Sequence, residues 1–129
     1  MLQGAMPLRS LIVDDSTHFL TAARDLLERE GMEVVAVASS CAEAVRLASE
    51  LHPDVALVDI DLGDESGLDV ARALAAADGG RARVLLISAY PECDFTDLVA
   101  ASPAVGFLSK AQLSAARIEE ILRGGQGPG

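Results

Sequence analysis

At residues 55–62 the chain reads Val55-Ala56-Leu57-Val58-Asp59-Ile60-Asp61-Leu62, four apolar residues followed by two aspartates that flank an isoleucine. A short apolar run without alternation is typical of a strand that is buried on both faces of a parallel sheet. We therefore interpret residues 55–58 as a central strand. Asp59 and Asp61 then lie at its carboxyl end, where parallel sheets bind their ligands.

Two similar apolar runs precede this stretch, and two follow it. They are Leu11–Val13, Val34–Val37, Val84–Ile87 and Val105–Leu108. The segments between the runs have the apolar spacing of helices, and the connections are short. This order of five strand-helix units predicts an α/β fold, a doubly wound five-stranded parallel sheet with helices on both faces.

The expected helices have recognisable ends. Ser16 is a candidate cap for the first helix, which Gly31 would end, and Ser40 with Glu43 has capping-box spacing at the start of the second, which stops before Pro53. The third carries Leu68 and Leu74 and runs out at Gly79-Gly80. A weaker fourth helix follows Pro91 with Phe95, Leu98 and Val99. The last carries Ile118, Ile121 and Leu122, starts between Gln112 and Ala115, and ends at Gly124-Gly125.

Length and charge limit the classes of protein to which the chain can belong. Its 129 residues suit one domain, which we place at residues 9–123, with an N-terminal extension at 1–8 and a flexible tail or linker at 124–129. The net charge of −10 argues against direct binding of nucleic acid by this domain. No leader and no membrane span are recognisable, and Cys41 and Cys93 lack metal-site spacing, so we expect a cytoplasmic protein with reduced thiols.

Polar side chains follow four of the five expected strands. Asp14 and Asp15 follow the first, Asp59 and Asp61 the third, Ser88 the fourth, and Lys110, the single lysine of the chain, the fifth. Carboxylates that share a small site repel one another, so their grouping favours a bound cation. Oxygen ligands suit Mg²⁺, and a compact ammonium suits a contact with one phosphoryl oxygen.

With these motifs the chain resembles the receiver domains of response regulators in two-component signal transduction. The matching stretches are Leu11–Ser16, Val58–Leu62 with Ser66–Leu68, Leu86–Ala89 and Gly106–Lys110. The resemblance covers residues 9–123. It implies the chemotaxis-regulator-like, flavodoxin-like (βα)5 fold, with strand order 2-1-3-4-5.

The resemblance also implies roles for individual residues. Asp59 is the expected phosphoacceptor, with Lys110 and Ser88 contacting the phosphoryl oxygens. Mg²⁺ or Mn²⁺ would be held by Asp14, Asp15, Asp59 and the backbone carbonyl of Asp61, with Asp14 acting through water or by orienting the site. Ser88 and Phe107 are the expected switch residues. Ala89 is small, as the family prefers beside the phosphoryl group.

The partners follow from the same resemblance. We expect a sensor histidine kinase or a phosphotransfer protein as the donor. The phosphorylated receiver would control an output domain or a separate partner protein. A helix-turn-helix DNA-binding domain that regulates transcription is one such output domain. Phosphorylation-dependent homodimers are a further expectation. The domain is not expected to be an enzyme, although it would assist its own phosphorylation and dephosphorylation.

Two positions depart from the family pattern. Gly63 and Ala111 stand where many members have proline. Gly63 predicts a looser loop after the acceptor. A cis bond before Ala111 would cost ~3 kcal/mol without proline, so we expect a trans bond.

Two alternatives remain at this point. A phosphatase of the haloacid-dehalogenase type also uses an Asp-x-Asp after a strand, but there the motif follows the first strand and the chain is usually longer. A degenerate receiver, acting purely as an interaction module, would keep the fold without taking phosphate. Steady turnover of a phosphomonoester would favour the phosphatase, and the absence of any Mg²⁺-dependent response to a phosphoryl donor would favour the degenerate receiver.

Overall fold

A computed structural model describes residues 8–77, 82–90 and 96–124. Its centre is a five-stranded parallel sheet in the order β2-β1-β3-β6-β7. The strands are β1 (Arg9–Val13), β2 (Glu33–Ala38), β3 (Val55–Asp59), β6 (Arg83–Ser88) and β7 (Gly106–Ser109). When the strands of this sheet are numbered along the chain, their order is 2-1-3-4-5, which confirms the predicted fold.

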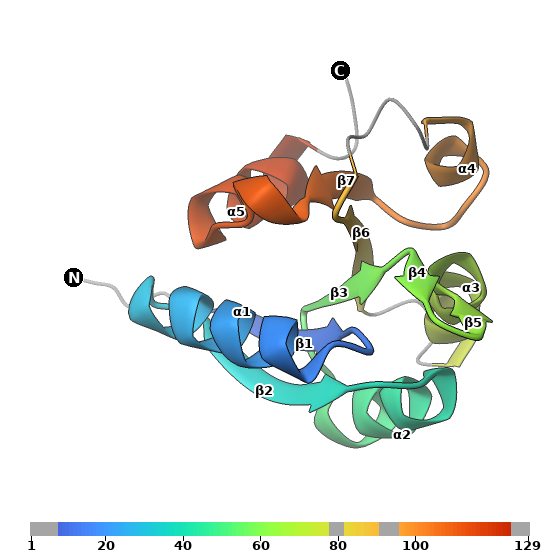
Figure 1. Ribbon diagram of the computed structural model, residues 1–129, viewed down its shortest axis with the longest axis horizontal. Coiled ribbons are helices and arrows are strands. Elements are labelled where there is room, and N and C mark those ends of the chain that lie inside the picture. The colour runs from blue at the N-terminus through green and yellow to red at the C-terminus, as the bar shows by residue number, and fades with distance from the viewer. Residues whose placement is uncertain (1–7, 78–81, 91–95, 125–129) are drawn as a thin grey trace.

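Helices cover both faces of the sheet (Figure 1). They are α1 (Thr17–Arg29), α2 (Cys41–Leu51), α3 (Gly67–Ala77), α4 (Thr96–Ala100) and α5 (Ala115–Gly124). In Figure 1, α1 and α5 lie on one side of the sheet, and α2, α3 and α4 on the other. No helix within the described residues combines the length and the apolar character that crossing a membrane requires.

The core consists of two apolar layers, one on each face of the sheet. Along β3, Ala56 and Val58 pack in the layer toward α2 and α3, whereas Val55 and Leu57 pack in the layer toward α1 and α5. All four are fully buried. Both faces of this strand therefore need apolar side chains, which explains why its sequence is an apolar run without alternation.

The helix caps follow the sequence, with one difference. Ser16 Oγ accepts the Phe19 N–H at 3.2 Å and caps α1, and Gly31 follows that helix with φ +92°. Ser40 Oγ accepts the Glu43 N–H at 3.2 Å and caps α2. In an ordinary capping box Glu43 would accept the N–H of the cap residue itself. Here its carboxylate accepts the N–H of Ser39 at 2.9 Å instead.

The segment after β3 forms a small hairpin that the sequence analysis did not predict. Strand β4 (Asp61–Leu62) pairs antiparallel with β5 (Glu65–Ser66), and Gly63 turns between them with φ +69°. Proline fixes φ near −65°, so it cannot occupy this turn. The conformation of the turn therefore accounts for the glycine, whereas the expected looseness of the loop stays a prediction.

Other expectations are settled only where the structure describes the chain. Helix α5 begins at Ala115, and a single 3₁₀ turn, η2 (Lys110–Gln112), precedes it. The described residues contain no cis peptide bond, which confirms the trans bond before Ala111. Cys41 is a free, half-buried thiol. The expectations for Gly79-Gly80, Pro91, Cys93 and Phe95 lie outside the described residues.

Candidate functional site

The carboxyl ends of the strands bring the expected polar residues together. Asp14 directly follows β1, Asp59 is the last residue of β3, and Ser88 is the last residue of β6. Lys110 begins η2, immediately after β7. Because neighbouring parallel strands end at the same edge, these four residues from four strands contribute to one site.

Three carboxylates form the acidic part of this site. Asp14, Asp15 and Asp59 each offer one oxygen, and these oxygens all lie within 4.8 Å of one another. Asp14 is fully buried and Asp59 is 5% exposed, whereas Asp15 is exposed. Two buried carboxylates beside a third that faces solvent leave one open side, through which a cation or a phosphoryl group can approach.

The Lys110 ammonium lies between the two buried carboxylates. Its Nζ is 2.6 Å from Asp14 Oδ2 and 3.1 Å from Asp59 Oδ2. Burial lowers the pKa of Lys110, but its interactions with the Asp14 and Asp59 carboxylates outweigh burial and raise the pKa overall, so the side chain stays protonated. The single cation therefore offsets part of the negative charge at the strand ends.

One buried oxygen indicates that a cation fits this site. Asp14 Oδ2 has the Lys110 ammonium as an ion-pair partner but forms no hydrogen bond with a described residue. A buried carboxylate oxygen normally has several partners. A divalent cation held by Asp14, Asp15 and Asp59 would supply one, and an all-oxygen donor set is the set that Mg²⁺ and Mn²⁺ prefer.

The environment of Asp59 changes its acidity. Burial raises its pKa to about 6, and the nearby charge of Asp14 adds to this, while the Asp61 N–H and Lys110 act in the opposite direction. The Asp61 N–H reaches Asp59 Oδ1 at 3.1 Å. At neutral pH Asp59 is therefore mainly ionised, yet its carboxylate is more basic than an ordinary aspartate.

Two glycines let the backbone approach these carboxylates closely. A Cβ on Gly63 would lie 3.1 Å from Asp15 Oδ2, and a Cβ on Gly67 would overlap the carbonyl oxygen of Asp59. The hairpin and the start of α3 thus close directly over the acidic residues. A cleft of about 260 Å³ remains, lined by the three aspartates, Asp61, Ser88 and Lys110 among others.

The two expected switch residues lie on the same face of the sheet. Ser88 is 2% exposed, and its Oγ accepts the Tyr90 N–H at 3.0 Å. Phe107 is buried in the core layer toward α2 and α3. It pairs with Leu86, two residues before Ser88, so Phe107 and Ser88 are diagonal neighbours on adjacent strands.

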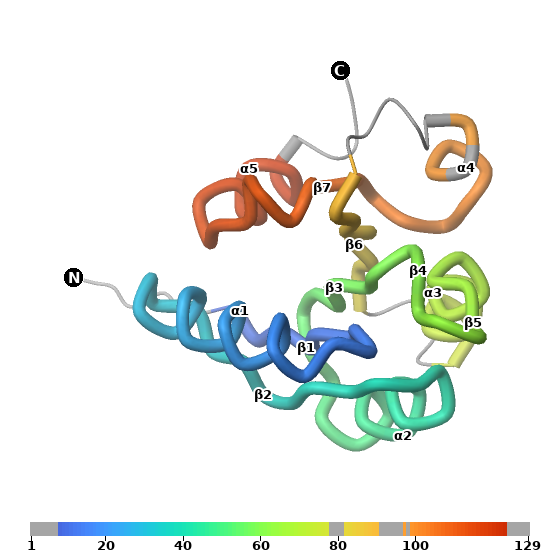
Figure 2. Tube along the Cα trace, in the orientation of Figure 1, coloured from blue at the N-terminus to red at the C-terminus, as the bar shows by residue number. Residues whose placement is uncertain are grey.

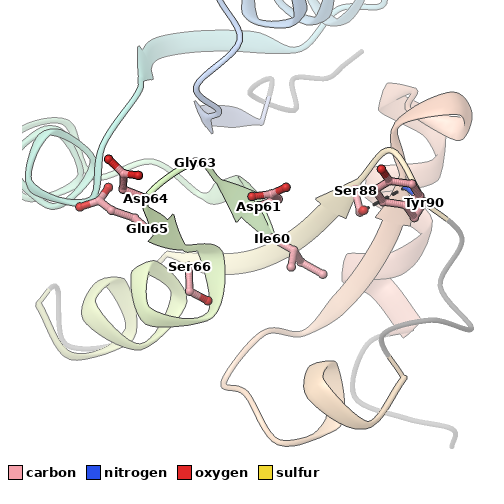
Figure 3. A pocket seen from close by; sticks show the side chains of 8 residues that line it. All are labelled: Ile60, Asp61, Gly63, Asp64, Glu65, Ser66, Ser88 and Tyr90. Carbon is pink, nitrogen blue, oxygen red and sulfur yellow. Dashed lines mark hydrogen bonds between the residues drawn. The ribbon is translucent and has the colours of Figure 1, made fainter.

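A second hollow lies beside the hairpin (Figure 3). It has a volume of about 530 Å³, and it is lined by Ile60, by five hairpin residues, and by Ser88 and Tyr90. The hairpin residues are Asp61, Gly63, Asp64, Glu65 and Ser66. Figure 3 shows Ser88 and Tyr90 facing the hairpin across this hollow. The sequence analysis did not single out Tyr90, which is 60% exposed and borders both hollows.

Comparisons with known proteins agree with this geometry. A family model of the response regulator receiver domain matches residues 10–123. The nitrate/nitrite response regulator protein NarP of Escherichia coli (strain K12) is 34% identical over 124 residues, which cover 95% of this chain and 57% of that protein. Protein-glutamate methylesterase/protein-glutamine glutaminase 5 of Myxococcus xanthus (strain DK1622) is 34% identical over 117 residues, which cover 89% of this chain and 34% of that protein.

A solved structure extends the likeness to three dimensions. The signal receiver domain of the putative response regulator NarL from Mycobacterium tuberculosis matches with a TM-score of 0.79 and 30% identity, covering 96% of this chain and 100% of that one. The chain spans only part of the length of the two curated relatives, so their names describe larger proteins. The family model, the parallel sheet and the acidic strand ends lead to one conclusion: the chain belongs to the response regulator receiver domains of two-component signal transduction.

Proposed function

We propose that Asp59 accepts a phosphoryl group from the phosphohistidine of a sensor histidine kinase or a phosphotransfer protein. The observation that carries the proposal is the position of the Asp59 carboxylate. It lies at the end of the central strand, 3.1 Å from the Lys110 ammonium and within 4.8 Å of two further carboxylates. A cleft that contains a basic carboxylate, one cation and a divalent-metal donor set suits phosphoryl transfer.

The chemistry needs few groups. An oxygen of the ionised Asp59 forms the new bond to phosphorus as the P–N bond of the donor breaks, and the electron pair of that bond stays on the imidazole. The product is an acyl phosphate on Asp59. Lys110 offsets charge on the phosphoryl oxygens, and the Ser88 hydroxyl donates a hydrogen bond to one of them. Mg²⁺ or Mn²⁺, held by Asp14, Asp15, Asp59 and the Asp61 carbonyl, would offset further charge on these oxygens.

The same residues connect the chemistry to the surface. Once an acyl phosphate forms, the Ser88 hydroxyl gains an acceptor with more charge than any group now beside it. Movement of Ser88 toward that acceptor opens space next to its diagonal neighbour Phe107. We infer that Phe107 moves into this space, and that the surface around β6 and β7, the last two strands of the sheet, changes as a result.

Two longer relatives guide the proposal for what this switch controls. The relatives in which similar chains occur include a nitrate/nitrite response regulator and a methylesterase, both longer than this chain. We propose a cytoplasmic receiver domain at residues 9–123 that controls an output domain or a partner protein. A helix-turn-helix domain is one such output, and phosphorylation-dependent dimers are one route to it. The receiver itself, with a net charge of −10, would not contact nucleic acid.

Phosphorylation can be tested directly with the purified chain. Incubation with Mg²⁺ and acetyl phosphate should add one phosphoryl group that hydroxylamine removes, as measured by intact-protein mass spectrometry. Asp59→Asn should abolish the addition, whereas Asp64→Asn, which changes an exposed carboxylate in the hairpin turn, should not. Undiminished labelling of Asp59→Asn would refute the proposed acceptor. Steady release of phosphate from a phosphomonoester would instead indicate a phosphatase.

A further inference from the structure

Phe19, an aromatic residue of α1, lies against the functional lysine. The centroid of its ring is 4.2 Å from Lys110 Nζ. The Lys110 side chain is 19% exposed, so the ring and the two carboxylates shield most of it from water. A cation over an aromatic face at this distance is attracted by the ring quadrupole, and the attraction increases when water is excluded.

The contact is the last link in a closed set of interactions. Asp14 Oδ1 accepts the Ser16 N–H at 2.8 Å, and Ser16 Oγ accepts the Phe19 N–H at 3.2 Å. The Phe19 ring contacts Lys110, and Lys110 returns to Asp14 through the 2.6 Å ion pair. The first turn of α1 is therefore fixed by the same carboxylate that binds the lysine, which places the Phe19 ring relative to the site.

The ring differs from the other partners of Lys110 in one respect. Asp14 and Asp59 are also expected to bind the cation or the phosphoryl group, so their bonds to Lys110 change when the site fills. A phenyl ring offers no lone pair and competes for neither ligand. Lysine has a long flexible side chain, and a partner that persists through both states reduces the freedom that the ammonium would otherwise gain.

We propose that Phe19 is a positioning residue for Lys110, which holds the ammonium over its ring and within reach of Asp59 before and after the phosphoryl group arrives. The proposal rests on the proposed function, because it assumes that Lys110 contacts the phosphoryl oxygens. It adds a part of α1 to the phosphorylation machinery. It also predicts that an aromatic ring is needed at this position rather than apolar volume alone.

The single lysine of the chain makes the contact directly observable. Labelling with lysine carrying carbon-13 at the ε position gives one NMR signal, which reports Lys110 alone. In the wild type we expect a ring-current upfield shift of the ε protons and a nuclear Overhauser effect to the Phe19 ring. Phe19→Tyr should keep both signatures. Phe19→Leu should lose the ring-current shift and narrow the signal as the side chain becomes more mobile.

The consequence for function is measured with beryllofluoride, an analogue of the phosphoryl group, in the presence of Mg²⁺. Phe19→Leu should weaken its binding by roughly two- to thirtyfold, the range that corresponds to cation–π attraction, and Phe19→Tyr should restore it. Leu26→Ala is the matched control. Leu26 is a half-buried residue that packs in the same core layer from the same helix. Its truncation should lower the melting temperature and leave both the lysine signal and the beryllofluoride affinity unchanged.

Two results at Lys110 and Phe19 would overturn the positioning role, and a third would come from the control variant. One is a wild-type Lys110 signal without a ring-current shift. The other is a Phe19→Leu variant that binds beryllofluoride as tightly as Phe19→Tyr. Failure of the proposed function has a different signature, because then the wild type itself would not bind beryllofluoride with Mg²⁺, whatever the lysine signal shows. A loss of affinity that Leu26→Ala reproduces would also contradict the proposal, since it would trace the effect to the stability of α1.

Discussion

Lys110 contacts side chains from three separate parts of the chain at the site. It pairs with two buried carboxylates and contacts the ring of Phe19. The sequence identifies it because it is the only lysine in a chain that otherwise uses arginine. The contacts themselves were not predictable, since they join η2 to Asp14 after β1, to Asp59 in β3 and to Phe19 in α1, which all lie far away in the sequence. A residue's type and position at a strand end could be read, but its partners across the sheet could not.

Removal of the lysine should separate metal binding from the response to phosphorylation. In Lys110→Ala, Asp14 and Asp59 lose a cation that occupies their inner side, so Mg²⁺ should bind roughly two- to tenfold more tightly. The acyl phosphate should still form, but with a weaker structural response, because a phosphoryl oxygen loses its ammonium partner. Isothermal titration with Mg²⁺ and the NMR spectrum with beryllofluoride measure the two effects.

The control for this variant removes an arginine charge elsewhere. Arg72→Ala breaks an exposed ion pair with Asp69 on α3 and should alter neither quantity. If Lys110→Ala responds to beryllofluoride as the wild type does, then Lys110 has no part in the switch. Weaker Mg²⁺ binding by the variant would show that the ammonium helps to organise the carboxylates instead of competing for them.

At the scale of elements, the β4–β5 hairpin links the segment after Asp59 to a neighbouring helix. Glu65 Oε1 accepts the N–H of Cys41, the first residue of α2, at 2.8 Å. Figure 2 shows the hairpin beside α3, with α2 next to both. A carboxylate at the start of a helix is favoured by the helix dipole. Glu65 therefore ties the hairpin that carries the Asp61 carbonyl to the start of α2.

The sequence could not predict this hairpin. Its strands have two residues each, too few to show an apolar period, and its turn depends on the positive φ of Gly63. The five long strands were predictable because each is buried on both faces and therefore continuously apolar. The capping partner of α2 was predictable only in its local part, Ser40 to Glu43. Glu65, which comes from another element, was not.

Loss of the tie should weaken metal binding. Glu65→Ala should lower the free energy of unfolding by about 1 kcal/mol, as the loss of a helix cap does. It should also weaken Mg²⁺ binding by about fivefold. This factor corresponds to roughly 1 kcal/mol, the free energy that Mg²⁺ binding must then spend on ordering the untied hairpin. Mg²⁺ titration can be followed by the fluorescence of Tyr90, the only tyrosine in a chain without tryptophan, which borders the cleft.

Glu43→Ala is the control for this experiment. Glu43 also accepts an N–H at the start of α2, that of Ser39 at 2.9 Å, but it has no link to the hairpin among the described residues. Its loss should therefore lower stability to a similar extent and leave Mg²⁺ affinity unchanged. Equal affinities in the two variants would mean that the tie stabilises α2 without positioning the Asp61 carbonyl.

The elements that carry the proposed switch residues should change most when the site is filled. Ser88 ends β6 and Phe107 belongs to β7, so their rearrangement should alter amide hydrogen exchange at residues 84–90 and 105–109. The comparison is between the Mg²⁺-bound protein with and without beryllofluoride, measured by mass spectrometry. Changes confined to residues 16–50, on the opposite half of the sheet, would contradict coupling through Ser88 and Phe107.

At the scale of the whole molecule, the sheet brings charge together at one edge while the rest of the core stays apolar. The described residues with buried polar side chains are Ser10, Asp14, Asp59 and Ser88, and three of these lie in the site. The sequence predicts such an edge because polar residues stand at the carboxyl ends of four of the five strands. The order of the strands did not follow from the pattern, which fits several orders; it came from the resemblance to a family.

This concentration of charge should make the stability of the whole domain depend on pH and Mg²⁺. Burial raises the pKa of Asp59 from 3.8 to about 6, so between these values the folded state binds more protons than the unfolded state. The free energy of unfolding should therefore fall as the pH rises through this window, and the penalty is fully present above it.

Asp59→Asn should remove this dependence and melt higher than the wild type at neutral pH in chelator. Mg²⁺ should stabilise the wild type by about 2.7 kcal/mol at a hundred times its dissociation constant, and Asp59→Asn by less. Asp14→Asn is the contrasting variant, because Asp14 also accepts the Ser16 N–H and lies 2.6 Å from Lys110, so the loss of its charge should not stabilise the fold. Thermal melts of the three proteins from pH 4 to 8, with Mg²⁺ and with chelator, measure these changes in stability. If Asp59→Asn melts lower than the wild type at neutral pH in chelator, then Lys110 stabilises the buried carboxylate more than burial destabilises it.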